Sequence, residues 1–312
     1  FAAESIFLLP FVIARIFRPT FLDVFQLNNF ELGTLYSTYG IVALLSYVYG
    51  GTLADRYPPR KLMATALIMT AAGGIYLAQF PSYQGLQWLY GYWGFSTIFL
   101  FWSAMIKATR NWGGGTQQGR AFGYLEAGRG LVAASIGVIG VLVFSFLLPE
   151  DLNSASFEER KAAFRYVILF AVLLATLVGI IVFFYLKEQE AQEEISAPKA
   201  DNSLSNIIQV AKMPTVGLLI VIVLCAYCGY KVTDILSLYA SEVMLFDEVD
   251  AAKVGSYQMY LRPLVCVLVG VFADKSSSAL WLIRGFGVLF IGSLVFASGL
   301  INAPLSGLFI FA

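Results

Sequence analysis

The sequence predicts an all-α protein that crosses a membrane many times. Of its 312 residues, 59% are hydrophobic and only 13% are charged, and the mean hydropathy is +0.75. Soluble domains contain roughly 45–50% apolar and about 25% charged residues. The apolar residues gather in long runs that match the roughly 20 residues a helix needs to cross a bilayer. These runs are too long and continuous for the strands of a membrane barrel.

Composition also excludes several classes of function. The 20 basic and 20 acidic residues cancel, so the chain has no nucleic-acid-binding footprint. It has no histidine, so any proton transfer needs carboxylates, tyrosines or lysines. Cys225 and Cys228 have C-x-x-C spacing, but no second pair and no histidine complete a zinc site. We interpret these two cysteines and Cys266 as small apolar helix residues, and expect no metal, no cofactor and no disulfide framework.

The apolar runs predict nine helices and the start of a tenth. Pro263 lies inside one of them, where it predicts a kink. The chain lacks a starting methionine and begins and ends within apolar runs, so we expect a piece of a longer protein, truncated at both ends. The predicted spans are 1–17 (or as far as 25), 32–53, 62–80, 86–108, 121–148, 164–186, 215–240, 251–273 and 279–300, with the tenth from 304.

A polar segment divides the chain. Residues 187–203 are acidic, polar and proline-containing, which is typical of a solvated linker. The predicted domains are a six-helix bundle over 1–187, a cytoplasmic linker over 188–205 and an incomplete second bundle over 206–312. Similar residues, LGTLY at 32–36 and VGSY at 254–257, open corresponding helices in the two parts. Such pairing indicates an internal repeat.

Lysines and arginines set the predicted orientation. Short loops rich in these residues face the cytoplasm. If the helices alternate in direction, all the basic loops fall on one side, and the opposite loops, at 150–151, 158–159 and 247–250, carry acids. The apolar start lacks the features of a cleavable signal peptide. The basic residues that define the cytoplasmic side are Arg56, Arg60, Lys61, Arg110, Arg120, Lys187, Lys199 and Lys212.

One short polar turn recurs between apolar runs. The first copy is GTLADRYPPRK at 51–61, and a shorter version, GVFADK, lies at 270–275. The first copy resembles the signature G-x-L-A-D-R-x-G-R-R, which the major facilitator superfamily carries between helices 2 and 3. The superfamily carries a degenerate copy of this signature between helices 8 and 9. It departs from that signature at Pro58 and Pro59. The positions that match are Gly51, Leu53, Ala54, Asp55, Arg56 and Arg60.

The resemblance implies a twelve-helix fold of two pseudo-symmetric bundles, of which helices 1 to the start of 10 are present. It also implies a cytoplasmic gate, in which Asp55 meets an arginine at the inner end of helix 4. Arg110 is the first candidate for that arginine and Lys107 the second, and Gly51 would allow close helix approach. Arg56 and Arg60 fit either the gate or simple orientation by charge. Gly270 and Asp274 would belong to the corresponding gate of the second copy.

Six ionisable residues lie within the predicted spans. An ionisable side chain at bilayer depth is expensive, so it usually faces a cavity or a partner. Glu126 with Arg129, and Lys231 with Asp234, form acid–base pairs three residues apart on one helix face. This spacing also fits pairs that are purely structural and only neutralise each other. The resemblance implies that these residues line a central cavity, as substrate or coupling residues. They are Arg15, Glu126, Arg129, Lys231, Asp234 and Arg262.

The resemblance favours a secondary active transporter working by alternating access. Because basic residues outnumber acids in the predicted cavity, we expect a small anionic organic solute, bound by charge-assisted hydrogen bonds. Glu126 or Asp234 would carry a coupling proton, in symport or antiport, unless a counter-transported ion serves instead. The alternatives are an efflux carrier for amphipathic cations or drugs, and a membrane sensor that does not transport.

We expect no enzymatic activity, because no nucleophile elbow or metal cluster is present. The glycine-rich segment 112–120 lacks the phosphate-binding G-x-x-x-x-G-K-[ST] pattern. The expected partners are the lipid bilayer and a small-molecule solute, with protons or another ion, and no nucleic acid. The expected state is a monomeric, multi-pass protein of the bacterial inner (plasma) membrane.

Overall fold

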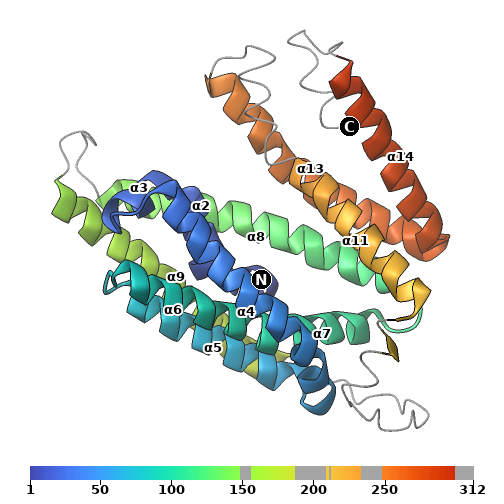
Figure 1. The fold of residues 1–312 in the computed structure, drawn as a ribbon, viewed down its shortest axis with the longest axis horizontal. Coiled ribbons are helices and arrows are strands. Elements are labelled where there is room, and N and C mark those ends of the chain that lie inside the picture. The colour runs from blue at the N-terminus through green and yellow to red at the C-terminus, as the bar shows by residue number, and fades with distance from the viewer. Residues whose placement is uncertain (148–155, 187–208, 211, 233–247, 299–312) are drawn as a thin grey trace. The chain divides into compact units, whose positions relative to one another are not determined.

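The computed structural model describes residues 1–147, 156–186, 209–210, 212–232 and 248–298, and every regular element in them is helical (Figure 1). The predicted all-α fold is therefore confirmed. The predicted linker 188–205, the tenth helix and Asp234 lie outside the described residues. The chain divides into two compact units: unit 1 contains Phe1–Gly114 and Gly128–Glu190, and unit 2 contains Gly115–Ala127 and Ala191–Ala312.

Helix boundaries agree broadly with the predicted spans. Unit 1 contains α1 (Ala2–Ser5), η1 (Leu8–Val12), α2 (Ile13–Ile16), α3 (Arg18–Val24), α4 (Asn29–Arg56), α5 (Pro59–Leu77), α6 (Tyr83–Gly94), η2 (Phe95–Trp102), α7 (Ser103–Gly113) and α9 (Phe157–Tyr185). Helix α8 (Gln118–Leu147) contributes to both units. Unit 2 also contains α11 (Pro214–Val232), α13 (Glu248–Lys275) and α14 (Ser278–Ala297).

The first predicted span is built from short helical pieces. Pro10 cannot donate a backbone hydrogen bond, and its ring crowds the preceding turn. The turn widens in response: the Val12 amide bonds the Phe7 carbonyl five residues back, at 3.2 Å, which makes η1 a π-helical turn. The helical path then continues through α2 and α3 to Val24, close to the longer of the two predicted limits.

Capping boxes start two of the long helices. At α4, the Glu31 amide donates to Asn28 Oδ1 at 2.9 Å, and the Asn28 amide donates to Glu31 Oε2 at 2.8 Å. Ser156 and Glu159 make the same reciprocal pair at α9. Each box satisfies amides that the first helical turn leaves unpaired. Helix α9 therefore begins at Phe157 rather than at the predicted 164, because the cap supports a polar first turn.

Replacing Asn28 with alanine is expected to lower the free energy of unfolding by about 1 kcal/mol, since it removes the side-chain acceptor at the start of α4. Asn28→Asp keeps an acceptor and should unfold close to the wild-type temperature. Thermal unfolding of the purified protein in detergent measures both. Equal losses in the two variants would show that the cap is not the stabilising feature.

Unit 1 has a tightly packed core in which α5 lies beside α9, and α4 lies beside α6 and η2 (Figure 1). A Cβ added at Gly94 would lie 2.6 Å from the Tyr39 carbonyl oxygen, so glycine is needed for this approach. Two hydrogen bonds join buried polar groups of neighbouring helices in this core. The Tyr39 and Thr97 hydroxyls lie 2.6 Å apart, and Trp93 donates to the Thr70 carbonyl at 3.1 Å.

The outer surfaces of the helices are apolar. Among the described residues, Phe157–Tyr185 and Ser278–Val295 have the length and hydropathy of membrane-crossing helices, and Pro214–Gly229 is a shorter apolar helix. A continuous apolar surface of this kind suits lipid and would promote aggregation in water. The exposed side chains on α4 and α9 include Ile41, Leu44, Leu45, Val48, Leu173, Leu177, Ile181 and Phe184.

Candidate functional site

Helices α8 and α13 touch backbone to backbone within unit 2. Gly119 and Gly123 of α8 face Gly270 and Cys266 of α13. A Cβ built at Gly123 would lie 2.6 Å from the Cys266 carbonyl oxygen. A Cβ built at Gly119 would meet the carbonyl oxygen of Gly270, and one built at Gly270 would meet that of Gly119. Small residues four apart on both helices are what membrane helices use for close contact.

Asp274 lies at one end of this contact between α8 and α13. Its carboxylate accepts hydrogen bonds from the Gly119 amide at 2.6 Å and the Arg120 amide at 2.8 Å, in the first turn of α8. The side chain of Asp274 is only 11% exposed. A carboxylate here satisfies unpaired amides and neutralises the positive end of the helix dipole. Gly270 and Asp274, both predicted gate residues, thus lie at one contact between two helices.

An ion pair lies farther along the same two helices. Arg262 of α13 donates to Glu126 of α8 at 3.3 Å, and their side chains are 41% and 33% exposed. Cys266, one turn beyond Arg262, is a free, partly buried cysteine. No acid lies one helical turn from Arg262 in its own helix, and α8 supplies the partner.

A second ion pair lies within unit 1. Arg129 Nε lies 3.3 Å from Glu4 Oε2, and the side chains are 21% and 13% exposed. The Arg129 guanidinium carbon also lies 5.6 Å from the Trp102 ring centre and 5.8 Å from that of Phe7. Sequence reasoning paired Glu126 with Arg129 along one helix, whereas the structure gives each of them an ion-pair partner on another helix. It missed Glu4, whose only signal was a lone acid in an apolar run.

Comparisons with known proteins decide the family. A family model described as Major Facilitator Superfamily matches residues 2–312. The chain belongs to the Major Facilitator Superfamily. It is similar to two Escherichia coli (strain K12) proteins: 27% identical over 264 residues to inner membrane protein YihN (81% of this chain, 58% of that protein), and 26% identical over 229 residues to inner membrane protein YqcE (73% and 52%). The chain spans about half the length of these curated relatives.

Superfamily membership confirms the predicted family and identifies an integral membrane protein of a transporter family. A third relative is the uncharacterized protein MG294 homolog of Mycoplasma pneumoniae (strain ATCC 29342 / M129 / Subtype 1), 26% identical over 293 residues, with 84% of this chain and 58% of that protein covered. Within the described residues, no group of three or more His, Cys, Asp or Glu side chains is placed to hold a metal ion.

The first superfamily motif lies at the end of α4, where the Asp55 and Arg56 side chains are exposed. Lys107, the second candidate partner, donates to the Ala54 carbonyl at 2.7 Å and to the Asp55 carbonyl at 3.4 Å. A lysine here satisfies carbonyls that the helix end leaves unpaired. Lys107 therefore ties α7 to the motif by donating to two backbone carbonyls of α4. Arg110, the first candidate, lies in the last turn of the same helix.

The structure also shows the surroundings of Gly51 and Arg60, two other residues of this motif. An added Cβ at Gly51 would meet no described atom within 4 Å, whereas one at Gly50 would lie 3.0 Å from the Phe99 carbonyl oxygen. In the described residues, the close approach of α4 to η2 is thus made by Gly50. The Arg60 guanidinium carbon lies 5.6 Å from the Phe183 ring centre, so Arg60 contacts α9.

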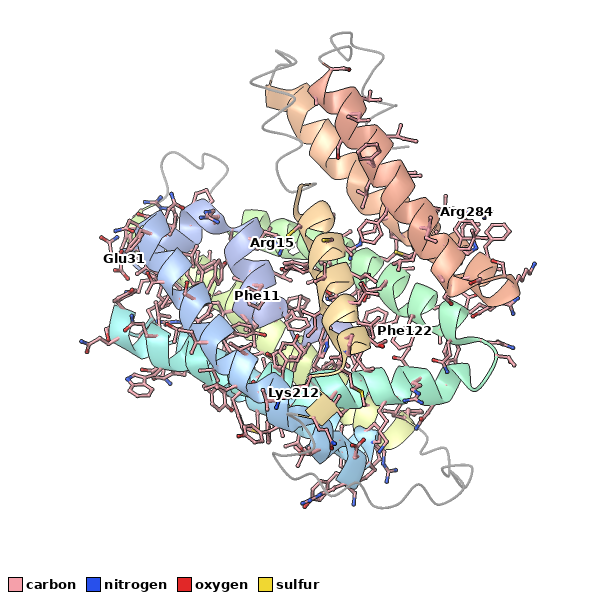
Figure 2. The ribbon with its side chains drawn as sticks, turned by 45° about the vertical axis from the view of Figure 1, so that its right-hand side comes forward. Phe11, Arg15, Glu31, Phe122, Lys212 and Arg284 are labelled. Atoms are coloured by element: carbon pink, nitrogen blue, oxygen red, sulfur yellow. The ribbon has the colours of Figure 1, made fainter. Side chains whose placement is uncertain are left out.

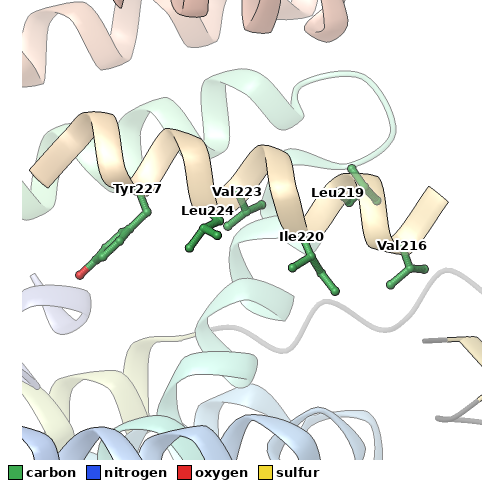
Figure 3. Close-up of a pocket in the computed structure, with 6 residues that line it drawn as sticks. All are labelled: Val216, Leu219, Ile220, Val223, Leu224 and Tyr227. Atoms are coloured by element: carbon green, nitrogen blue, oxygen red, sulfur yellow. The ribbon is translucent and has the colours of Figure 1, made fainter. Parts of the chain in front are cut away.

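The remaining predicted site residues are placed less completely. Arg15 is exposed at the end of α2 (Figure 2). Lys231 lies in the last turn of α11, but its side chain is not among those described, and Asp234 lies outside the described residues. Helix α11 carries an open apolar groove formed by Val216, Leu219, Ile220, Val223, Leu224 and Tyr227 (Figure 3). Its lining holds one polar group, the Tyr227 hydroxyl, so it offers a solute almost no charge or hydrogen bonding.

Proposed function

We propose that the chain forms part of a secondary active transporter, which moves a small anionic organic solute by alternating access. The observation that carries this proposal is the Arg262–Glu126 ion pair, which joins α8 and α13 beside a glycine contact. Charged groups in apolar membrane helices are expensive and usually serve a pathway or a partner. A pair that links two helices can separate and re-form when those helices move, and superfamily membership supports such motion.

The balance of charge supports an anionic solute. The basic side chains are Arg15, Arg129, Lys231 and Arg262, and guanidinium groups bind carboxylate or phosphate through paired hydrogen bonds. Arg15 is exposed, which suits contact with a solute. Glu4 was not among the predicted site residues and adds one acid to the set. The excess of basic over acidic side chains is therefore smaller than predicted. We retain Glu126 and Asp234 as the proposed carriers of a coupling proton.

We propose that the Asp274 contact is part of a cytoplasmic gate. The carboxylate lies on the first turn of α8, so moving α13 away would expose the helix amides and cost the charge–dipole interaction. The distribution of lysine and arginine supports a cytoplasmic location. The names of the two E. coli relatives support the inner membrane as the site of action.

Asp274→Asn is expected to open this gate more often, because it removes the charge while keeping the side-chain shape. A charge–dipole interaction worth about 1 kcal/mol corresponds to roughly a fivefold change in the open fraction. In a full-length background in which every other cysteine, Cys225 and Cys228 included, is replaced by serine, the rate at which a soluble maleimide labels Cys266 reports this opening. Asp23→Asn, in a separate ion pair with Arg160, is the matched control. An unchanged labelling rate in Asp274→Asn would contradict the gate.

Uptake by the full-length protein in proteoliposomes tests the transport proposal. We expect accumulation of a labelled organic anion and a response to an imposed pH gradient. A sensor would bind the anion without moving it, and accumulation of an amphipathic cation instead would favour the efflux alternative.

A further inference from the structure

The first helical segment has one open face. Four residues with helical spacing, Glu4, Phe7, Phe11 and Arg15, are partly or fully exposed. Most of the side chains between them are buried in the core of unit 1. The open face therefore presents, in order, an acid, two aromatic rings and a base (Figure 2 labels Phe11 and Arg15).

Two neighbouring elements complete one end of this face. Trp102 of η2 lies against Phe7, with ring centres 6.0 Å apart, and Arg129 of α8 lies against both rings and pairs with Glu4. We call Glu4, Phe7, Trp102 and Arg129 the Arg129 cluster. Aromatic rings continue beyond it, since Phe11 lies 5.3 Å from the Tyr36 ring centre. A charged group that is partly buried, with 21% of the Arg129 side chain exposed, thus lies at the end of an aromatic surface.

We propose that the Arg129 cluster binds an aromatic carboxylate, whose anionic group replaces Glu4 at Arg129 and whose ring lies against Phe7 and Trp102. This inference rests on the proposed function and specifies the solute class. One carboxylate can replace another at a guanidinium with little change in hydrogen bonding, so the exchange itself costs little. The two rings already hold Arg129 in place, and their planes lie 60° apart, so a solute ring can pack against the face of one and the edge of the other.

If the solute carboxylate replaces Glu4 at Arg129, two substitutions should have opposite effects on binding, which is not expected of a purely structural ion pair. Glu4 competes with the solute, so Glu4→Gln should tighten binding, while Arg129→Gln should abolish it. For a partly exposed pair, the expected gain in affinity with Glu4→Gln is about fivefold. A structural pair would instead give weaker binding or poorer folding in both variants.

The test is titration calorimetry of the purified full-length protein, with benzoate as the aromatic probe and acetate and inorganic phosphate as comparisons. Benzoate should bind most tightly. Trp102→Leu should weaken benzoate binding by roughly tenfold and leave acetate binding nearly unchanged, because only benzoate loses a ring contact. Arg129→Lys keeps the charge, and is expected to fold and to bind benzoate weakly.

The control is Lys161→Gln. The Lys161 ammonium lies 5.2 Å from the Phe80 ring centre. The substitution therefore removes a contact between a cation and an aromatic ring elsewhere in unit 1, and it should not change benzoate binding. The inference is overturned if Glu4→Gln fails to tighten binding, if Trp102→Leu weakens acetate as much as benzoate, or if phosphate binds more tightly than benzoate. Benzoate binding without uptake would count against transport alone, while uptake of another anion without benzoate binding would count against this inference alone.

Discussion

Arg262→Ala is expected to reduce solute uptake by roughly 30-fold. Removing one member of a buried ion pair leaves the other charge without compensation. Because the Arg262 and Glu126 side chains are 41% and 33% exposed, the penalty is discounted to about 2 kcal/mol. The measurement is the initial rate of anion uptake into proteoliposomes, at matched amounts of inserted full-length protein.

A charge swap gives the sharper form of this test. Glu126→Arg alone places two arginines together and should abolish uptake, while Glu126→Arg with Arg262→Glu should restore part of it. Arg284→Ala is the matched control, because Arg284 is exposed on α14 and contacts the Trp281 ring (Figure 2 labels Arg284). If the swap stays as inactive as the single variant, the pair does not act as the proposed link between α8 and α13.

The second large effect is expected from Gly123→Ala. The new methyl group would lie 2.6 Å from the Cys266 carbonyl oxygen, a backbone atom that cannot move without shifting α13. We expect the helices to separate and uptake to fall about tenfold or more, since overpacking a close contact costs roughly 1–3 kcal/mol. Uptake and the maleimide labelling rate of Cys266 measure the two consequences.

Gly128→Ala is the control that tests whether the loss of uptake in Gly123→Ala is steric. Gly128 lies on the same helix, and an added Cβ there would meet no described atom within 4 Å. Both substitutions gain the same helix propensity, about 1 kcal/mol, so only the contact differs between them. Equal behaviour of the two variants would mean that the α8–α13 contact has no functional role.

Helix boundaries show where sequence reasoning stopped short. Hydropathy located the helices, but it began α9 at 164, because the polar turn from Phe157 lowers the local average. The capping pattern Ser156-x-x-Glu159 was present in the sequence and would have placed the start correctly. The pieces around Pro10 were harder to foresee, since a proline can produce a kink, a break or a widened turn.

The candidate site was predicted as a set of residues but not as a set of pairs. Glu126, Arg129 and Arg262 were predicted because charges are rare at bilayer depth. Glu126 was paired with Arg129 because their i,i+3 spacing on one helix favoured a local pair, whereas Arg262 has no acid at that spacing in its own helix. Glu4 was missed because nothing along the chain relates it to Arg129, which lies on a different helix.

The sequence by itself determined the helical class, the membrane location and the family, since apolar run length and a local motif are properties of short segments. Only the tertiary structure decided that Glu126 meets Arg262, that Glu4 meets Arg129, and that Asp274 caps α8. These contacts depend on how two helices are rotated and shifted against each other. That register is set by close packing at positions such as Gly119 and Gly123, over distances that no local pattern encodes.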